Sequence, residues 1–225
     1  MAVSMKIIAR MHSDFPEKFG IPRQSGLVDE LYSTIVFEPD YRNAEALRGL
    51  DSYSHLWIVW QFSESVRTEW SPTVRPPRLG GNTRMGVFAT RSPFRPNSIG
   101  LSCVKLAGIE QTKQYGTVIH VLGADLMDGT PIFDIKPYIP YCDCKPDAVG
   151  GFTADADDFL LEVEDPVGLL EKVPETKRAA LIGVLSHDPR PSYHTDTGRV
   201  YGIEFAGKNI RFRVEDKKLI ICEIE

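Results

Sequence analysis

Arginine is concentrated in one part of the chain. Six arginines and no lysine lie between residues 67 and 95, and one acidic residue, Glu69, opposes them. A planar guanidinium binds phosphate or carboxylate through two parallel hydrogen bonds. Proline and glycine interrupt the run, which favours a loop over a charged, solvated helix. The stretch therefore predicts a binding site for an anion. The arginines are Arg67, Arg75, Arg78, Arg84, Arg91 and Arg95.

The densest candidate site begins with a predicted strand over residues 84–90. A turn follows in which Pro93 and Pro96 fix the backbone, so that Arg91 and Arg95 project from a rigid support. Preset backbone angles reduce the entropy that is lost when a ligand is bound. This turn is the place where we expect an anion to be held, although a purely structural proline turn has the same pattern.

Two further loops carry polar groups next to predicted strands. Asp125 and Asp128 follow a strand closely, and such carboxylates bind ribose hydroxyls, face a cationic ligand, or simply form Asx turns. The loop at residues 22–24 (Pro-Arg-Gln) offers hydrogen-bond donors. His55 opens an apolar strand, and we interpret it as a core or strand-end histidine in preference to a catalytic base.

Familiar motifs are missing. The chain has no Walker A loop, no GxSxG elbow and no GxGxxG fingerprint. Its four cysteines form no Cys-x-x-Cys pair, so we expect reduced thiols and no zinc site. The polar loop at residues 186–194 matches no metal-ligand spacing either, and we therefore expect no bound metal. The cysteines are Cys103, Cys142, Cys144 and Cys222.

The first two thirds of the chain predict β-strands rich in β-branched and aromatic residues. Seven strands with little between them indicate a closed or nearly closed β-barrel. One short helix is expected over 43–50. Two long connections, 11–33 and 63–83, show no regular pattern, and loops of that length are usually functional. The expected strands are 6–10, 34–38, 55–62, 84–90, 99–109, 116–126 and 131–138.

The character of the sequence changes after residue 141. Nine acidic residues and one lysine lie between 147 and 175. A helix or two is expected in this acidic stretch, a further helix over 174–187, and a three-stranded meander from residue 199. The predicted fold class is therefore mainly β, with a β-barrel at residues 1–145 and a small α+β module at 146–225.

Composition describes an ordinary globular chain. Of its 225 residues 42% are hydrophobic, and the formal net charge is −5. The longest apolar runs are far shorter than the roughly 20 residues that span a bilayer, and the N-terminus lacks signal-peptide features. We therefore expect a cytoplasmic protein without a membrane segment.

Several motifs, taken together in chain order, resemble the TsaA-like family. The resemblance covers nearly the whole chain, and the family includes the bacterial enzyme that methylates N6 of N6-threonylcarbamoyladenosine at tRNA position 37, beside the anticodon. It implies a methyltransferase that uses S-adenosylmethionine (SAM), is built on a β-barrel instead of a Rossmann sheet, and works as a homodimer with SAM near the subunit interface. The motifs are Pro22-Arg-Gln, Ser54-His-Leu-Trp, Arg75-Pro-Pro-Arg-Leu-Gly-Gly, the run from Gly86 to Gly100, Asp125-Leu-Met-Asp-Gly-Thr-Pro, Asp134-Ile-Lys-Pro-Tyr and Asp188-Pro-Arg-Pro-x-Tyr.

The resemblance also implies positions around SAM. Arg91 suits the methionine carboxylate, and a carboxylate beside apolar walls suits the sulfonium and adenosine. The positions are Pro22, Arg23, Gln24, His55, Leu56, Arg91, Leu101, Asp125, Leu126, Met127, Asp128, Gly129 and Thr130. A group that accepts the N6 proton is left unassigned among Asp125, Asp128, His55 and Tyr138, and the proton itself could be acidic enough to need little assistance.

The arginine-rich stretch is then expected to bind the anticodon stem-loop of tRNA. Because the whole chain is acidic, affinity must come from a local patch and must fall steeply with salt. Predicted RNA contacts are Arg75, Arg78, Arg84, Arg95, Arg190 and Tyr193, with Trp57, Trp70, Phe88 or Phe94 to stack a base. Two alternatives are a non-catalytic RNA-binding module and a methyltransferase that acts on a small molecule.

Overall fold

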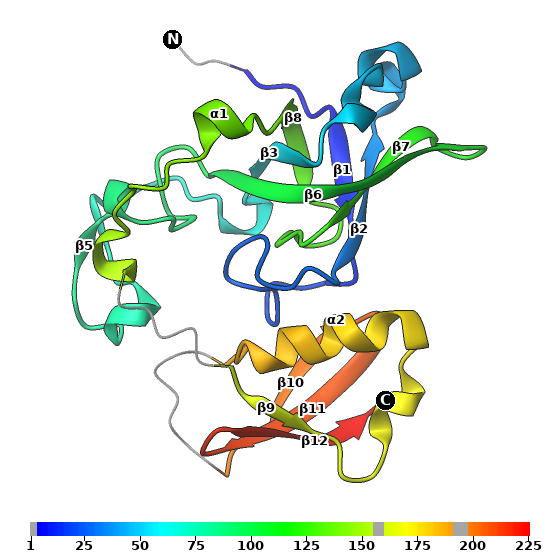
Figure 1. Cartoon of the computed structure of the whole chain (residues 1–225). Helices are drawn as coiled ribbons and strands as arrows, with labels where there is room; N and C mark the ends of the chain where they lie inside the picture. Colours follow the sequence, from blue (N-terminus) through cyan, green and yellow to red (C-terminus); the bar gives the residue numbers. More distant parts are fainter. Residues whose placement is uncertain (1–3, 155–159, 191–197) are drawn as a thin grey trace.

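The computed structural model describes residues 4–154, 160–190 and 198–225, apart from the side chain of Arg78. Two main sheets organise the chain (Figure 1). The first has six strands in the order β1-β2-β7-β6-β3-β8, and because β8 also pairs with β1, the sheet closes into a barrel. The predicted mainly β fold is confirmed. The strands are β1 (Ala9–His12), β2 (Tyr32–Phe37), β3 (His55–Gln61), β6 (Ile99–Thr112), β7 (Gly116–Leu122) and β8 (Pro131–Pro137).

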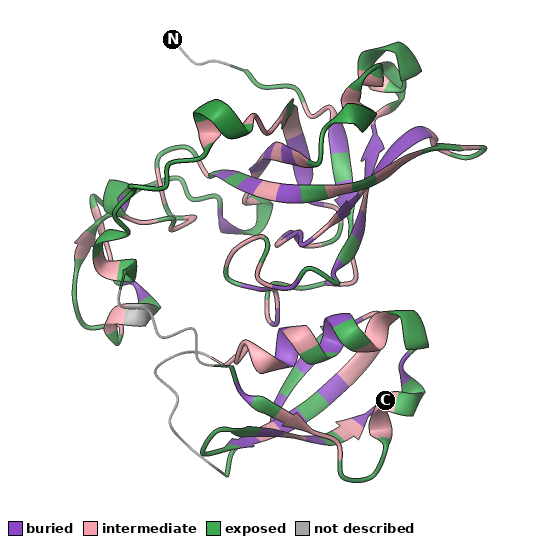
Figure 2. Cartoon of the chain, in the orientation of Figure 1, coloured by how far each residue is buried: buried purple, intermediate pink, exposed green. Residues whose placement is uncertain are grey.

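Side chains that alternate along the strands fill the interior of this sheet. On β3, Leu56, Ile58 and Trp60 are buried, while the residues between them face outward. Trp60 lies opposite Gly100 of β6, and a Cβ atom on Gly100 would come within 2.2 Å of the indole ring. Glycine is therefore required at this position. Figure 2 shows the same alternation of buried and less buried residues along the strands.

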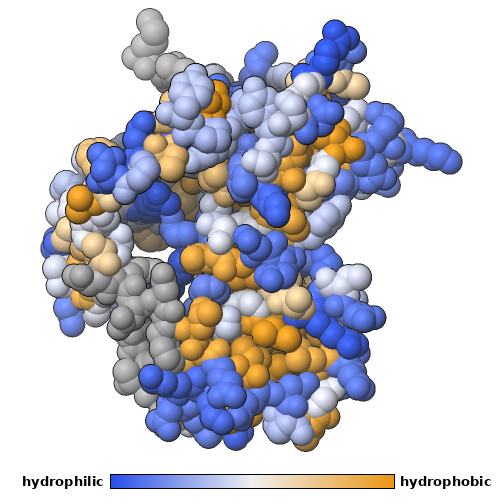
Figure 3. Space-filling view, in the orientation of Figure 1, coloured by the Kyte–Doolittle hydropathy of each residue, from blue (hydrophilic) through white to orange (hydrophobic). Residues whose placement is uncertain are grey.

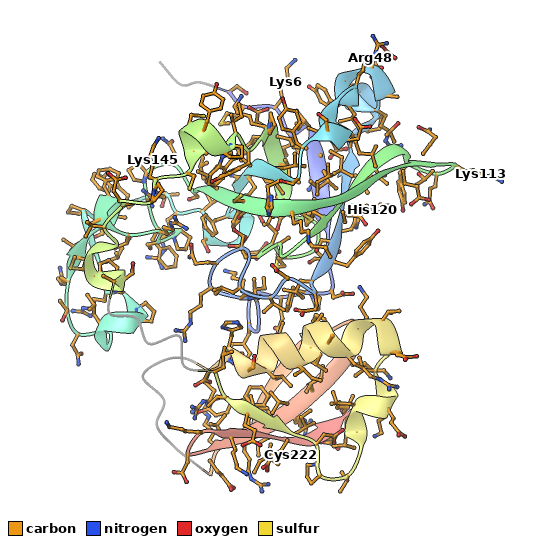
Figure 4. The ribbon with its side chains drawn as sticks, viewed as in Figure 1. Lys6, Arg48, Lys113, His120, Lys145 and Cys222 are labelled. Carbon is orange, nitrogen blue, oxygen red and sulfur yellow. The ribbon has the colours of Figure 1, made fainter. Side chains whose placement is uncertain are left out.

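The β6–β7 hairpin extends beyond the rest of the sheet, and Lys113 lies at its tip (Figure 4). On the outer face of this region the His120 ring has a partner at each nitrogen. Thr34 Oγ1 lies 3.0 Å from Nδ1, and a carboxylate oxygen of Glu110 lies 2.8 Å from Nε2. This cluster is on a different part of the sheet from the arginine-rich stretch.

The second sheet belongs to the C-terminal part and has the order β10-β11-β12-β9. The predicted helix over 174–187 and the predicted meander are both confirmed. The helix or two expected in the acidic stretch is not found among its described residues, which form 3-10 turns and β9, a strand that runs parallel to β12. Helix α2 buries Ala180, Leu181, Val184 and Leu185, and apolar side chains gather in this region in Figure 3. The elements are β9 (Glu162–Glu164), α2 (Glu175–Ser186), β10 (Tyr201–Phe205), β11 (Lys208–Glu215) and β12 (Lys218–Ile224).

The connection between β1 and β2 enters the second core. Phe15, Val28 and Leu31 are buried among the apolar side chains of α2 and β10 to β12. His187, at the end of α2, bonds through Nε2 to the carbonyl of Leu27 at 2.8 Å. The second core thus draws residues from both sides of the predicted boundary at 145–146.

Two further predictions are wrong, namely the strand over 84–90 and the helix over 43–50. The predicted strand over 84–90 is reduced to β5 (Met85–Gly86), which pairs with β4 (Thr73–Val74) outside the barrel, and a 3-10 turn at Val87–Ala89 follows. The Val87 amide still donates to the carbonyl of Pro72 at 2.9 Å, but Pro72 has no N–H to donate in return, so the ladder ends there. The connection 63–83 therefore contains a strand and is not structureless.

The predicted helix over 43–50 is also absent in that form. Two 3-10 turns, Ala44–Leu47 and Leu50–Ser52, stand there instead. Gly49 lies between them with φ +84°, a left-handed conformation that ends the first turn and prevents one continuous helix.

Short helices occupy the remaining connections. Helix α1 (Pro140–Asp143) follows β8 and leads through Lys145 toward the β4–β5 hairpin (Figures 1 and 4). Within the described ranges, no helix is long and apolar enough to cross a membrane. All four cysteines are free thiols. The other 3-10 segments are Pro39–Tyr41, Ser63–Ser65, Pro77–Leu79, Gly151–Thr153 and Leu169–Lys172.

Candidate functional site

A cavity of about 570 Å³, here called the inner cavity, opens where the end of β3 meets the start of β6. Four connections complete its wall, and they contribute residues from 18–24, 62–65, 90–95 and 125–130. The volume lies within the range of small-molecule sites, roughly 300–1,000 Å³. Chain segments that are far apart in sequence therefore meet around a space of cofactor size.

Asp125 is a half-buried carboxylate of this wall. Ser102 Oγ donates to its Oδ1 at 2.6 Å, and Trp60 Nε1 donates to the same hydroxyl at 2.9 Å. Because an indole N–H can only donate, the direction of the whole relay is fixed toward the carboxylate. Burial raises the pKa of Asp125, while the Ser102 bond, backbone amides and the charge of Arg91 oppose that rise.

Arg91 stands at the same cavity, held by a neutral partner. Its Nη1 donates to the side-chain oxygen of Gln24, and Gln24 in turn bonds the carbonyl of Arg23. Arg23 Nη2 donates to the main-chain carbonyl of Arg190 at 3.4 Å. The C-terminal module therefore contacts the loop that carries these side chains.

A larger cavity of about 1550 Å³, here called the outer cavity, adjoins the inner one. The two share Arg23, Gln24, Arg91 and Arg95 in their walls. Both sides of the β4–β5 hairpin line the outer cavity, together with residues 149–154 of the following connection. Cations and aromatic rings dominate its lining: Arg23, Arg67, Arg75, Arg84, Arg91, Arg95, Trp70, Phe88, Phe94 and Phe152.

Several of these side chains are arranged for contact with bases. The Arg67 guanidinium lies over the Phe94 ring, 3.8 Å from its centroid, and the Trp70 and Phe88 rings are 6.1 Å apart. Phe88 is 72% exposed. Exposed rings beside guanidinium groups suit stacking of unpaired bases and contact with phosphates.

The structure brings most of the predicted cofactor residues together. Eight of the thirteen line the inner cavity: Pro22, Arg23, Gln24, Arg91, Leu101, Asp125, Met127 and Thr130. Trp57, a predicted stacking residue, also lines it, as does Arg95. The sequence predicts these residues on separate strands and loops, so it is the topology of the fold that brings them to one cavity.

The other five do not line this cavity. Leu56 and Leu126 are fully buried in the barrel core, so their side chains are closed to a ligand. Asp128 points the other way, where its Oδ1 accepts from the Ser13 amide and lies 3.3 Å from His12. Gly129 bonds Met11 through its amide. His55 bonds Ser54 at 2.9 Å and is not part of the lining.

Tyr138, a predicted catalytic candidate, lies beside His55 and Trp57, with ring centroids 6.2 and 5.8 Å away. It is not among the residues that line the inner cavity. Desolvation and the neighbouring Cys144 raise the pKa of its hydroxyl, which makes it a weaker acid than a free tyrosine. Of the four candidates for accepting a proton, Asp125 lines the cavity.

The predicted RNA contacts divide into two groups. Arg75, Arg84 and Arg95 line the outer cavity. Arg190 is instead paired with Asp188, both of its bonds to the carboxylate being 2.8 Å long. Tyr193 and the side chain of Arg78 lie outside the described residues.

Sequence reasoning missed Ser102 and Trp60, which hold Asp125. The available signal was indirect, because Trp60 belongs to an alternating strand and Ser102 lies two residues after Gly100, the glycine on which the indole packs. The described part of the chain contains no cluster of three or more metal-ligating side chains.

Comparisons with known proteins agree along the whole chain. Residues 10–144 match the family model of the tRNA-methyltransferase O N-terminal domain, and residues 155–225 match that of the TrmO C-terminal domain. A crystal structure of TrmO from Pseudomonas aeruginosa superimposes with a TM-score of 0.80 and 31% identity, covering 100% of both chains.

Curated relatives carry matching names. The tRNA (adenine(37)-N6)-methyltransferase of Escherichia coli K12 is 43% identical over 227 residues, which is 97% of this chain and 96% of that protein. A putative S-adenosylmethionine-dependent methyltransferase, RcsF, of Pseudomonas aeruginosa is 39% identical over 98% of this chain and 96% of its own. The human tRNA (adenine(37)-N6)-methyltransferase is 39% identical over 134 residues, 59% of this chain and 29% of that protein.

Proposed function

The chain belongs to the tRNA-methyltransferase O family, and we propose from this premise that it methylates N6 of N6-threonylcarbamoyladenosine at position 37 of tRNA. It is a SAM-dependent tRNA (adenine-N6)-methyltransferase. The observation that carries the proposal is the junction of the two cavities. A pocket of cofactor size with a half-buried carboxylate shares part of its wall with a cavity lined with arginine and aromatic rings.

The residues of the inner cavity fit SAM. The amino-acid end of SAM carries a carboxylate, for which the Arg91 guanidinium is a suitable donor, and its apolar atoms match Leu101 and Met127. Pro22 and Gln24 also line this cavity. When bound, SAM supplies an electrophilic methyl group on a sulfonium centre.

The protein's own contribution to the transfer is position and proton acceptance. The target base enters from the outer cavity, so that N6 approaches the methyl group in line. N6 must lose its proton as the new bond forms, and the proposed acceptor is Asp125, which lines the inner cavity. Burial raises the pKa of this carboxylate and so makes it a stronger base, while Ser102 keeps one oxygen fixed.

The outer cavity is the proposed site for the anticodon stem-loop. Its nucleotides are already unpaired, so presenting a base costs less than flipping one out of a duplex. Arg75 and Arg84 are placed for phosphates, and Trp70, Phe88 and Phe94 for stacking. The negative net charge of the protein does not prevent tRNA binding, because the arginines are gathered on one surface.

We also propose a homodimer that works in the cytoplasm, where tRNA is modified, with a SAM-binding β-barrel domain at 1–145 and a C-terminal domain at 146–225. Ile99 and Leu101 support the dimer, since they are 37% and 57% exposed beside the inner cavity and burying such side chains against a second copy is favourable.

The decisive experiment supplies methyl-labelled SAM and two tRNA pools, one from cells able to make threonylcarbamoyladenosine and one from cells unable to make it. We expect label in the first pool alone, on that nucleoside after digestion. If neither pool is labelled although calorimetry shows SAM binding, SAM remains the cofactor and threonylcarbamoyladenosine is rejected as the methyl acceptor.

A further inference from the structure

Arg91 and Arg95 are both held through Nη1 at the junction of the two cavities. Arg95 Nη1 donates to the carbonyls of Thr90 at 2.9 Å and of Ser92 at 3.4 Å, and Arg91 Nη1 donates to the Gln24 side-chain oxygen. Among the described residues, neither has a hydrogen-bond or ion-pair partner at Nε or Nη2.

Three other arginines of the chain have a carboxylate as the partner of Nε. Arg10, Arg190 and Arg213 each direct Nε to a carboxylate at 2.7 to 2.9 Å. The Nε–Nη2 edge is the one that holds a carboxylate through two parallel bonds. The junction therefore offers two fixed guanidinium groups whose carboxylate-binding edges are open.

The two side chains face different parts of the junction. Arg91 is tied to inner-cavity groups, through Gln24 and through its charge interaction with Asp125. Arg95 is hydrogen-bonded to carbonyls of its own turn. The preceding residue, Phe94, lines the outer cavity and not the inner one. Both arginines line both cavities, and Arg91 is the one whose partner and charge interaction lie in the inner cavity, which leaves Arg95 for a group that comes from the outer cavity.

We propose that Arg95 binds the carboxylate of the threonylcarbamoyl group and so selects tRNA that already carries this modification. The inference rests on the proposed function, which brings N6 into the inner cavity. The threonyl carboxylate hangs on N6 a few bonds from the reacting atom, closer than any phosphate of the same nucleotide. Arg91 remains for the carboxylate of SAM, so each guanidinium edge has one carboxylate.

The test measures binding of anticodon stem-loops to the full chain without SAM. Wild type is titrated with loops that carry either threonylcarbamoyladenosine or adenosine at the target position. We expect a preference of roughly tenfold or more for the modified loop, the range for a hydrogen-bonded charged group. Arg95→Ala should reduce this ratio to about one, because it should weaken the modified loop roughly tenfold more than the adenosine loop.

Arg84→Ala is the matched control, because Arg84 lines the outer cavity alone. It should weaken both loops equally and keep their ratio. A ratio preserved in Arg95→Ala, with SAM affinity intact, overturns the proposal.

A change in the ligand covers the case in which Arg95→Ala disturbs the 90–95 turn. A stem-loop whose threonyl carboxylate is a methyl ester keeps the size of the group but loses its charge. Wild type should bind this ester about as weakly as the adenosine loop, and binding as tight as the free acid rejects the role of Arg95. A wild type that neither prefers nor methylates the modified loop would instead reject the proposed function itself.

Discussion

The inner and outer cavities are adjacent, yet the protein builds them differently. The inner one is anchored on the barrel, where the register of β3 and β6 sets Trp60 opposite Gly100 and brings Ser102 to Asp125. The outer one is carried by a hairpin of two-residue strands, and its ring Phe88 is 72% exposed. Isolated two-stranded ladders are marginally stable in water.

This difference separates two tasks. Methyl transfer needs reacting atoms held within fractions of an ångström, which a closed sheet provides. RNA binding tolerates adjustable contacts, because phosphates and stacked bases accept a range of positions. Substitutions in the inner cavity should therefore change chemistry and SAM affinity, while those in the outer cavity should change tRNA affinity alone.

The largest effect is expected from Asp125→Asn. The amide keeps the size of the side chain and can still accept from Ser102, but it cannot take up a proton. The rate of methyl transfer at saturating SAM and tRNA should fall about 100-fold or more, the range for a lost general base. Single-turnover kinetics would measure it, with tRNA affinity as the control. An unchanged rate would show that N6 loses its proton to water.

Asp125 should also set the acid limb of the pH profile. Its folded pKa is raised, so it takes up a proton at a higher pH than an ordinary aspartate, whose pKa is about 3.9. Activity that needs the ionised carboxylate should therefore decline as pH falls through a value above that reference. The same raised pKa means that burying the ionised group costs stability, and this cost is relieved at low pH. A profile of single-turnover rate against pH, on tRNA pre-bound at low salt, would locate the limb.

The next largest effect is expected from Arg91→Ala on SAM. Removing the donor for a carboxylate should weaken SAM binding roughly tenfold or more, as measured by calorimetry. Arg75→Ala is the matched control, since Arg75 is exposed and lines the outer cavity alone. Equal losses in both variants would mean that the two cavities are not separate in function.

Arg84→Glu should act on the other side of the comparison. Reversing a charge that faces phosphates should raise the dissociation constant for tRNA several-fold and lower the slope of log affinity against log salt by about one. SAM affinity should be unchanged. Filter binding over a salt series measures both quantities, and a loss of SAM affinity would show that the hairpin supports the inner cavity.

The sequence predicted the fold well where patterns are local. Enrichment in β-branched and aromatic residues identified β3, alternation identified the C-terminal meander, and good helix formers with apolar residues at Ala180, Leu181, Val184 and Leu185 identified α2. It failed at residues 84–90, whose β-branched and aromatic residues satisfy the strand pattern. A proline-rich partner segment limits the ladder there to two residues, and pairing partners are not visible in one segment.

The site was predicted in part for a similar reason. Arg91, Asp125 and Leu101 were found because motifs carry them, and the fold brings all three to one cavity. Asp128 was a natural candidate because it stands three residues from Asp125, but the turn between them directs it to Ser13. The support of Asp125 by Ser102 depends on a contact across 23 positions of the chain, and no local pattern predicts it.

The smallest effect on methyl transfer is expected from Trp60→Phe, which is also the sharpest test of how the barrel supports the inner cavity. The ring still packs on Gly100, but Ser102 loses the indole N–H that donates to it, while its own bond to Asp125 remains. Ser102 then stabilises the ionised carboxylate less well, because cooperative hydrogen bonds strengthen one another. The acid limb should move to higher pH, with a loss of stability of about 1 kcal/mol. Trp57→Phe, which removes an indole donor from Asp143 instead, should leave the limb in place. A limb that does not move in Trp60→Phe would show that barrel packing, and not the hydrogen-bonded relay, sets the basicity of Asp125.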